Sequence, residues 1–146
     1  MSDRVLRIAL LVVSAAGIGV ASYLTYVHYQ PAALICTRGG GCETVQDSKY
    51  AVFAGIPVAV LGLASWIAAL VLTIWNSELA RTLTAALAVG ALAFAAYFVI
   101  LQLFVIDAIC LWCMANDVVL VPLLAVLALL RLRTAEPLET GSPPPA

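Results

Sequence analysis

The chain has 146 residues, of which 64% are hydrophobic and 10% are charged, and its formal net charge is −1. Soluble domains average about 45–50% apolar and about 25% charged residues, and so short a chain buries too little of its surface to hide this much apolar area from water. The composition therefore excludes a soluble globular domain, and no run of basic residues indicates a nucleic-acid partner.

Four segments are long and apolar enough to cross a hydrocarbon core of about 30 Å, which takes about 20 residues of helix. They cover residues 5–29, 56–75, 79–106 and 110–132. We predict an all-α integral membrane protein, a four-helix bundle within residues 1–133, in which an outer loop of residues 30–55 joins the first two spans. Residues 134–146 are polar and Pro-rich, which predicts a disordered cytoplasmic tail.

Several features inside the spans predict local structure. The first apolar stretch exceeds the roughly 7–15 residues of a signal-peptide core, so we expect it to be a retained anchor. Pro122 lies within the fourth span and is expected to kink it. Four glycines are expected to allow close helix packing: Gly17, Gly19, Gly62 and Gly90.

The basic residues predict the orientation of the spans. One side of the predicted membrane carries five of the seven Lys and Arg residues, namely Arg4, Arg7, Arg81, Arg131 and Arg133. The other side has Arg38 and Lys49, in the loop that joins the first two spans. The positive-inside rule then places both termini in the cytoplasm and this loop outside.

All four cysteines fall on the predicted outer side. Cys36 and Cys42 lie in the outer loop, and Cys110 and Cys113 open the fourth span. The outer face of a bacterial membrane, or the lumenal face of the endoplasmic reticulum, is where disulfides persist. An even number of cysteines gathered there predicts disulfide, metal or redox chemistry.

The second pair has the spacing of a redox motif. Cys110 and Cys113 are neighbours on one helical face, and the first turn of a helix favours a thiolate. Asp107 is placed to cap that turn. Asp117 follows on the same face about 10 Å deeper, where a carboxylate is costly and should face the bundle interior. We take Asp117 as a candidate proton donor; the alternative, which the sequence favours, is a carboxyl group that is hydrogen-bonded to a neighbouring helix or lies near the wet interface.

The first pair, in "CTRGGGC", is separated by three glycines that give the loop unusual conformational freedom. A thiolate from one pair can attack the disulfide of the other through a mixed disulfide. The two pairs therefore predict a relay that carries electrons from an outside protein through Cys36 and Cys42 to Cys110 and Cys113. A membrane quinone is the natural two-electron acceptor, because it dissolves in the same lipid as the spans.

At this point the residues resemble a known family, the vitamin K epoxide reductase family in its bacterial form. The resemblance rests on an ordered set of motifs over about residues 5–132. They are the loop pair Cys36 and Cys42, then Ser48, then "FAGIP" from Phe53 to Pro57, then "CLWC". It implies a four-helix bundle around a quinone, ubiquinone or menaquinone, with the outer loop capping the quinone site.

The resemblance also implies residue roles. Cys113 would face the quinone, and Cys110 would exchange with the loop. Cys42 would attack Cys110, Cys36 would meet a soluble partner, and Ser48 would hold the loop in place. Further candidates for contact with the quinone are Asp117, Trp112 and Phe53.

The chain departs from the family in two places. Vertebrate members carry a tyrosine where this chain has Asp117, so their epoxide chemistry and drug sensitivity are not carried over. Many bacterial members continue into a thioredoxin-like domain, whereas this chain ends at Ala146. We therefore expect a separate thioredoxin-like partner of the DsbA type and a location in the bacterial inner membrane.

Three alternatives remain open. Two cysteine pairs can form a four-thiolate zinc site, although the loop spacing is longer than usual. The chain could instead be a non-catalytic membrane protein with two structural disulfides, but a disulfide between Cys110 and Cys113 would constrain almost nothing. The chain could also be a four-helix disulfide oxidase of the DsbB type. That class has nearly the same function, but its two cysteine pairs follow one another in the reverse order along the chain.

Overall fold

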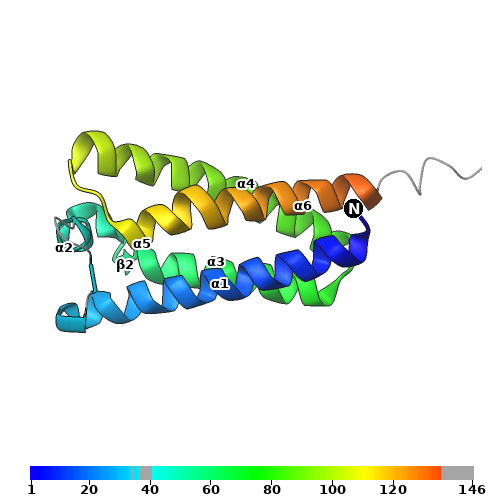
Figure 1. The fold of residues 1–146 in the computed structure, drawn as a ribbon, viewed down its shortest axis with the longest axis horizontal. Helices are drawn as coiled ribbons and strands as arrows, with labels where there is room; N and C mark the ends of the chain where they lie inside the picture. Colours follow the sequence, from blue (N-terminus) through cyan, green and yellow to red (C-terminus); the bar gives the residue numbers. More distant parts are fainter. Residues whose placement is uncertain (34, 37–40, 136–146) are drawn as a thin grey trace, which may run out of the picture.

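In the computed structural model, residues 1–33, 35–36 and 41–135 are described. Four long helices run side by side in an elongated bundle, with both the first residue and the end of the last helix at the same end (Figure 1). They are α1 (Asp3–Tyr29), α3 (Val58–Trp75), α4 (Glu78–Ile100) and α6 (Val121–Ala135). The opposite end of the bundle, which carries Cys36, Cys42, Cys110 and Cys113, is called the cysteine end below.

Four helical stretches are long and apolar enough to cross a membrane by length and composition. They are Asp3–Tyr29, Val58–Trp75, Glu78–Val105 and Leu111–Thr134. Each overlaps one of the predicted spans, and the all-α membrane bundle is confirmed. The predicted disordered tail lies almost wholly outside the described residues, which end at 135.

Small residues fill much of the bundle core. Buried alanines recur on all four long helices, at Ala21, Ala69, Ala85, Ala88, Ala95, Ala125 and Ala128. Lipid tails are as apolar as a leucine side chain, so helices in a membrane associate by close packing rather than by a hydrophobic driving force. Alanine suits such packing because it lets the helix backbones approach one another.

Gly17 provides the closest of these approaches. A Cβ atom at Gly17 would lie 2.1 Å from the ring of Trp66, so α1 and α3 pack together only because Gly17 has no side chain. Close helix packing was also expected at Gly19, Gly62 and Gly90, and this prediction was wrong. An added Cβ at each of them would meet nothing within 4 Å among the described residues. Gly62 and Gly90 instead line a cavity, described below.

Charged residues join the helices at the end opposite the cysteines. Asp3 accepts from the guanidinium of Arg131 at 3.0 Å and pairs with Arg81 at 3.5 Å. The Arg131 side chain, 2% exposed, also donates to the side chain of Asn76, which ends α3 in a left-handed conformation with φ of 55°. These contacts join α1, α3, α4 and α6 at this end of the bundle.

Two π-helical segments interrupt the helices near the cysteine end. The segment η3 (Leu101–Val105) continues α4, and η4 (Ala115–Leu120) joins α5 (Leu111–Met114) to α6. Pro122, just beyond η4, has no N–H and its ring crowds the preceding turn. The disturbance expected at Pro122 thus takes the form of a π-helical turn, whereas the sequence did not predict η3.

The connection between α1 and α3 folds across the cysteine end (Figure 1). Its described elements are η1 (Pro31–Ala33), α2 (Cys42–Asp47), η2 (Lys49–Ala51), β1 (Val52–Phe53) and β2 (Ile56–Pro57). The two strands form an antiparallel hairpin in which Phe53 pairs with Ile56. Ala54 and Gly55 make its turn with φ of 51° and 84°, the positive values that a two-residue hairpin favours.

We predict that Gly17→Ala destabilises the bundle by about 1–3 kcal/mol, because the added methyl overlaps the Trp66 ring. The measurement is thermal unfolding of the purified protein in detergent. Gly19→Ala is the matched control on the same helix, and it should leave the midpoint unchanged or raise it slightly, since alanine loses less backbone entropy on folding. Equal midpoints for the two variants would contradict the close contact.

Candidate functional site

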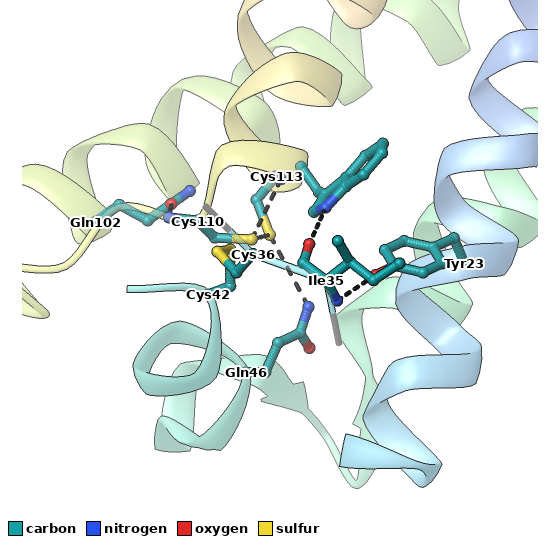
Figure 2. The surroundings of a disulfide bond; sticks show 9 residues. Tyr23, Ile35, Cys36, Cys42, Gln46, Gln102, Cys110 and Cys113 are labelled. Atoms are coloured by element: carbon teal, nitrogen blue, oxygen red, sulfur yellow. Dashed lines mark hydrogen bonds between the residues drawn. A yellow bond between two sulfur atoms is a disulfide. The ribbon is translucent and has the colours of Figure 1, made fainter. Parts of the chain in front are cut away.

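The two cysteine pairs lie next to each other at one end of the bundle, as predicted from the sequence. Cys36 and Cys42 form a disulfide, while Cys110 and Cys113 are free thiols whose sulfur atoms lie 2.6 Å apart. Cys42 and Cys110 are fully buried in one apolar cluster. Figure 2 shows the loop disulfide next to Cys110, with Cys113 beyond it. The fold therefore brings together residues that are about 70 positions apart in the sequence.

The start of the fourth span sets the geometry of its thiols. Cys110 is the N-cap residue of α5, and its sulfur accepts the backbone N–H of Cys113 at 3.3 Å. The sequence assigned this cap to Asp107, which was wrong. Asp107 lies in the connection before the helix, exposed and with φ of 53°, because α5 begins only at Leu111.

Hydrogen bonds to the Cys110 sulfur also affect its ionisation. Cys110 lies one residue before the span Leu111–Thr134. The hydrogen bond from the Cys113 thiol, followed by backbone N–H groups of the first turn, holds the pKa of Cys110 below its usual value despite burial. A thiol held in this way is more readily deprotonated.

Gln102 supports Cys110 from the end of the third span. Its side-chain oxygen accepts the Cys110 N–H at 2.9 Å, and its backbone oxygen accepts the N–H of Ala108 at 3.1 Å. The side chain is fully buried, and its Nε2 has no partner among the described residues. Gln102 was not among the residues predicted from the sequence, although a single amide inside an apolar span is a signal, since polar groups in lipid need a partner.

Trp112 attaches the loop to the CxxC motif. Its indole N–H donates to the backbone oxygen of Ile35 at 2.8 Å, and the backbone N–H of Ile35 donates to the Tyr23 hydroxyl at 2.7 Å. The rings of Tyr23 and Trp112 are also in contact, with centroids 5.0 Å apart. Ile35 is thus held on both sides, immediately before Cys36.

Two further loop residues, Gly41 and Ser48, determine the path of the loop near the bundle. A Cβ atom at Gly41 would lie 2.6 Å from the backbone nitrogen of Ile109, so this glycine is required for close approach to the residues before Cys110. The Ser48 hydroxyl donates to the backbone oxygen of Val45 at 2.7 Å and so closes the end of α2. This contact lies within the loop itself, and the role expected of Ser48 in holding the loop against the site stays a prediction.

A cavity of about 380 Å³ lies between the four long helices below the loop. Cys113, Asp117 and Phe53 line it, as do Gly62 and Gly90. Of the other predicted site residues, Cys36, Cys42, Cys110 and Trp112 do not belong to the lining that the described residues form. Cys113 is therefore the cysteine that faces the cavity, and Trp112 faces the loop instead.

The cavity suits a mostly apolar molecule. Its volume falls in the range of about 300–1,000 Å³ that small-molecule and cofactor sites occupy, and most of its lining is aliphatic or aromatic. Polar groups gather on one side, where the Trp66 indole N–H donates to Asn116 at 3.0 Å and the Asn116 amide donates to Asp117 at 2.9 Å. The residues present thus fit the ring of a quinone.

One comparison with known proteins bears on this site. A family model described as the vitamin K epoxide reductase family matches residues 8–128, more than four fifths of the chain. The matched stretch contains the loop disulfide, the CxxC motif and every cavity-lining residue named above. Among the described residues, no group of three or more His, Cys, Asp or Glu side chains is placed to hold a metal ion.

We predict that Gln102→Leu lowers the free energy of unfolding by about 1–3 kcal/mol, because the buried N–H of Cys110 loses its acceptor. Hydrogen exchange of the Cys110 amide should also become at least about tenfold faster. Gln30→Leu provides the same substitution at an exposed position and should change neither quantity. Unchanged exchange at Cys110 would show that the hydrogen bond does not hold the motif.

Proposed function

Because the chain belongs to the vitamin K epoxide reductase family, a family of membrane oxidoreductases, we propose that it is a membrane thiol–quinone oxidoreductase. It accepts electrons from a separate thioredoxin-like protein of the DsbA type and passes them through its two cysteine pairs to a membrane quinone. The reoxidised partner then introduces disulfides into other proteins.

One observation carries this proposal. The CxxC pair lies between the loop disulfide and the cavity, because Cys110 is buried beside Cys42 whereas Cys113 lines the cavity. Neither a structural disulfide nor a zinc site requires this order. A closed Cys36–Cys42 disulfide also leaves two free thiols, fewer than the four ligands of a structural zinc site.

The exposure of each cysteine supports a direction for the relay. Cys36 is partly exposed, and Ile35 beside it is 74% exposed, so a soluble protein can reach this sulfur. Attack on Cys36 by a thiolate of that protein frees the thiolate of Cys42, which lies against Cys110. Cys42 then attacks Cys110 in an oxidised CxxC pair, and the Cys113 thiolate leaves at the edge of the cavity. The second thiolate of the partner releases Cys36 and closes the partner's own disulfide, and Cys36 re-forms its disulfide with Cys42, which frees Cys110.

A quinone bound in the cavity supplies the acceptor for the two electrons and two protons released when the thiols of Cys110 and Cys113 join in a disulfide. Cys113, Asp117 and Phe53 would hold its ring, and the apolar lining excludes water around it. Asp117, oriented by the Asn116 amide, is the residue from which a proton can pass into the cavity. Ubiquinone and menaquinone both fit this chemistry.

The same proposal includes a location and an orientation. Arg81 and Arg131 lie with the N-terminus, at the end of the bundle opposite the cysteines. This separation supports cytoplasmic termini and an outward-facing loop under the positive-inside rule. We place the protein in a bacterial inner membrane, where the outer side is oxidising.

We expect the purified protein in lipid nanodiscs to reduce quinone when supplied with a reduced thioredoxin-like protein. Replacing Cys36 and Cys42 together by alanine should abolish this activity but retain quinone reduction by dithiothreitol, because the small dithiol reduces the CxxC pair directly. Cys113→Ala should abolish both activities. The measurement is quinone absorbance with each electron donor.

Two results would contradict the relay. Full activity in a variant with all four cysteines replaced would remove the cysteines from the reaction. Equal activity of the protein donor with and without Cys36 and Cys42 would show that electrons bypass the loop.

We further expect Asp117→Asn to lower kcat for quinone reduction by about a hundredfold, the lower end of the usual contribution of a general acid. Asn keeps the shape of the side chain but cannot deliver a proton. Asp107→Asn, at an exposed position in the connection before Cys110, is the matched control and should retain the wild-type rate. An unchanged rate in Asp117→Asn would exclude the carboxyl group as the proton donor.

A further inference from the structure

The short helix α2 directs a second side chain at the CxxC motif besides Cys42. Gln46 is half-buried, lines the cavity, and its amide Nε2 donates toward the Cys113 sulfur at 4.0 Å. Figure 2 shows the Gln46 amide extending from α2 toward Cys113. We propose that Gln46 is a catalytic residue that stabilises the Cys113 thiolate at the edge of the cavity through this hydrogen bond. The inference rests on the proposed relay, because the relay is what gives Cys113 a negative charge.

The spacing along α2 explains why one short helix serves both cysteines. Gln46 follows Cys42 by four residues and so lies on the same face of the helix, one turn further on. Val45 between them is 1% exposed and fixes α2 against the bundle. Cys42 therefore lies beside Cys110 while Gln46 reaches Cys113, so each cysteine of the motif is opposed by one residue of the loop.

The other polar side chains of the cavity are engaged elsewhere. The indole N–H of Trp66 donates to Asn116, the Asn116 amide donates to Asp117, and the Ser65 hydroxyl donates to the backbone of its own helix. Within the described part of the chain, the hydrogen bond recorded for the Gln46 side chain goes to the Cys113 sulfur. Gln46 is thus the cavity-lining amide directed at the reacting sulfur.

The chemistry of an amide suits this position. An amide N–H does not titrate near neutral pH, so Gln46 stabilises charge on the sulfur without exchanging a proton itself. A hydrogen bond to a charged partner is shorter and about twice as strong as one between neutral groups, and a low local dielectric strengthens it further. The 4.0 Å contact to a neutral thiol is expected to tighten when Cys113 loses its proton.

The test isolates the Cys113 thiol. In a Cys110→Ser background with the Cys36–Cys42 disulfide closed, Cys113 is the remaining thiol of the four cysteines. We expect Gln46→Met, which removes the donor but keeps the side-chain length, to slow alkylation of Cys113 by iodoacetamide about tenfold at neutral pH. Gln46→Glu, which puts a carboxylate at the same place, should slow it more.

Glu43→Gln is the matched control, because residue 43 is exposed on the same helix. In this variant Cys113 should be alkylated at the rate of the parent protein. An intact loop disulfide and an unchanged melting temperature establish that each variant is folded. Equal alkylation rates in folded Gln46→Met, Gln46→Glu and the parent would overturn the proposal.

A second readout separates this inference from the proposed function. With all cysteines present and dithiothreitol as donor, Gln46→Met should lower kcat for quinone about tenfold while KM stays within about twofold. If Gln46→Met slows alkylation of Cys113 and the protein with all four cysteines reduces no quinone, the Gln46 contact is supported and the quinone reaction is rejected. Wild-type kcat in Gln46→Met would reject the catalytic role and leave the relay standing.

Discussion

The contact between α2 and the start of the fourth span is the one on which the rest of the site depends. Gly41 permits it, because a side chain there would collide with the backbone nitrogen of Ile109. Cys42 is buried against Cys110 by the same contact, and Gln46 extends over Cys113 from the next turn. A loop of 26 residues in a short chain would otherwise sample many positions, at a considerable cost in entropy. Close packing at Gly41 places Cys42 beside Cys110.

Small residues have two different effects in this bundle. At Gly17 the missing side chain lets Trp66 pack against α1, and the buried alanines bring the helices together in the same way. At Gly62 and Gly90 the missing side chains leave space that becomes part of the cavity. The bundle is thus tightly joined at the end that carries Asp3 and Arg131 and hollow toward the cysteines.

The sequence predicted the elements whose determinants are local. The spans follow from length and apolarity, and the gathering of the cysteines follows from their positions relative to those spans. The cap at Cys110 and the contact of Trp112 with Ile35 could not be predicted, because each depends on the course of the chain in a loop. Gln46, which lies in the same loop, was missed for a related reason. An amide has no distinctive spacing in a sequence, and its role depends on which sulfur or backbone group lies within reach.

The π-helical segment η4 has a consequence for how the fourth span tolerates change. Such a segment corresponds to one extra residue inserted in an α-helix, and each residue of an α-helix turns the chain by about 100°. Loss of one residue from Ala115–Leu120 would restore a regular helix and swing Cys113 by that angle relative to α6. The sulfur would then leave the cavity although its sequence motif stayed intact. The helical phase at this segment therefore sets which side chains face the cavity, and insertions or deletions here should be far rarer in evolution than substitutions.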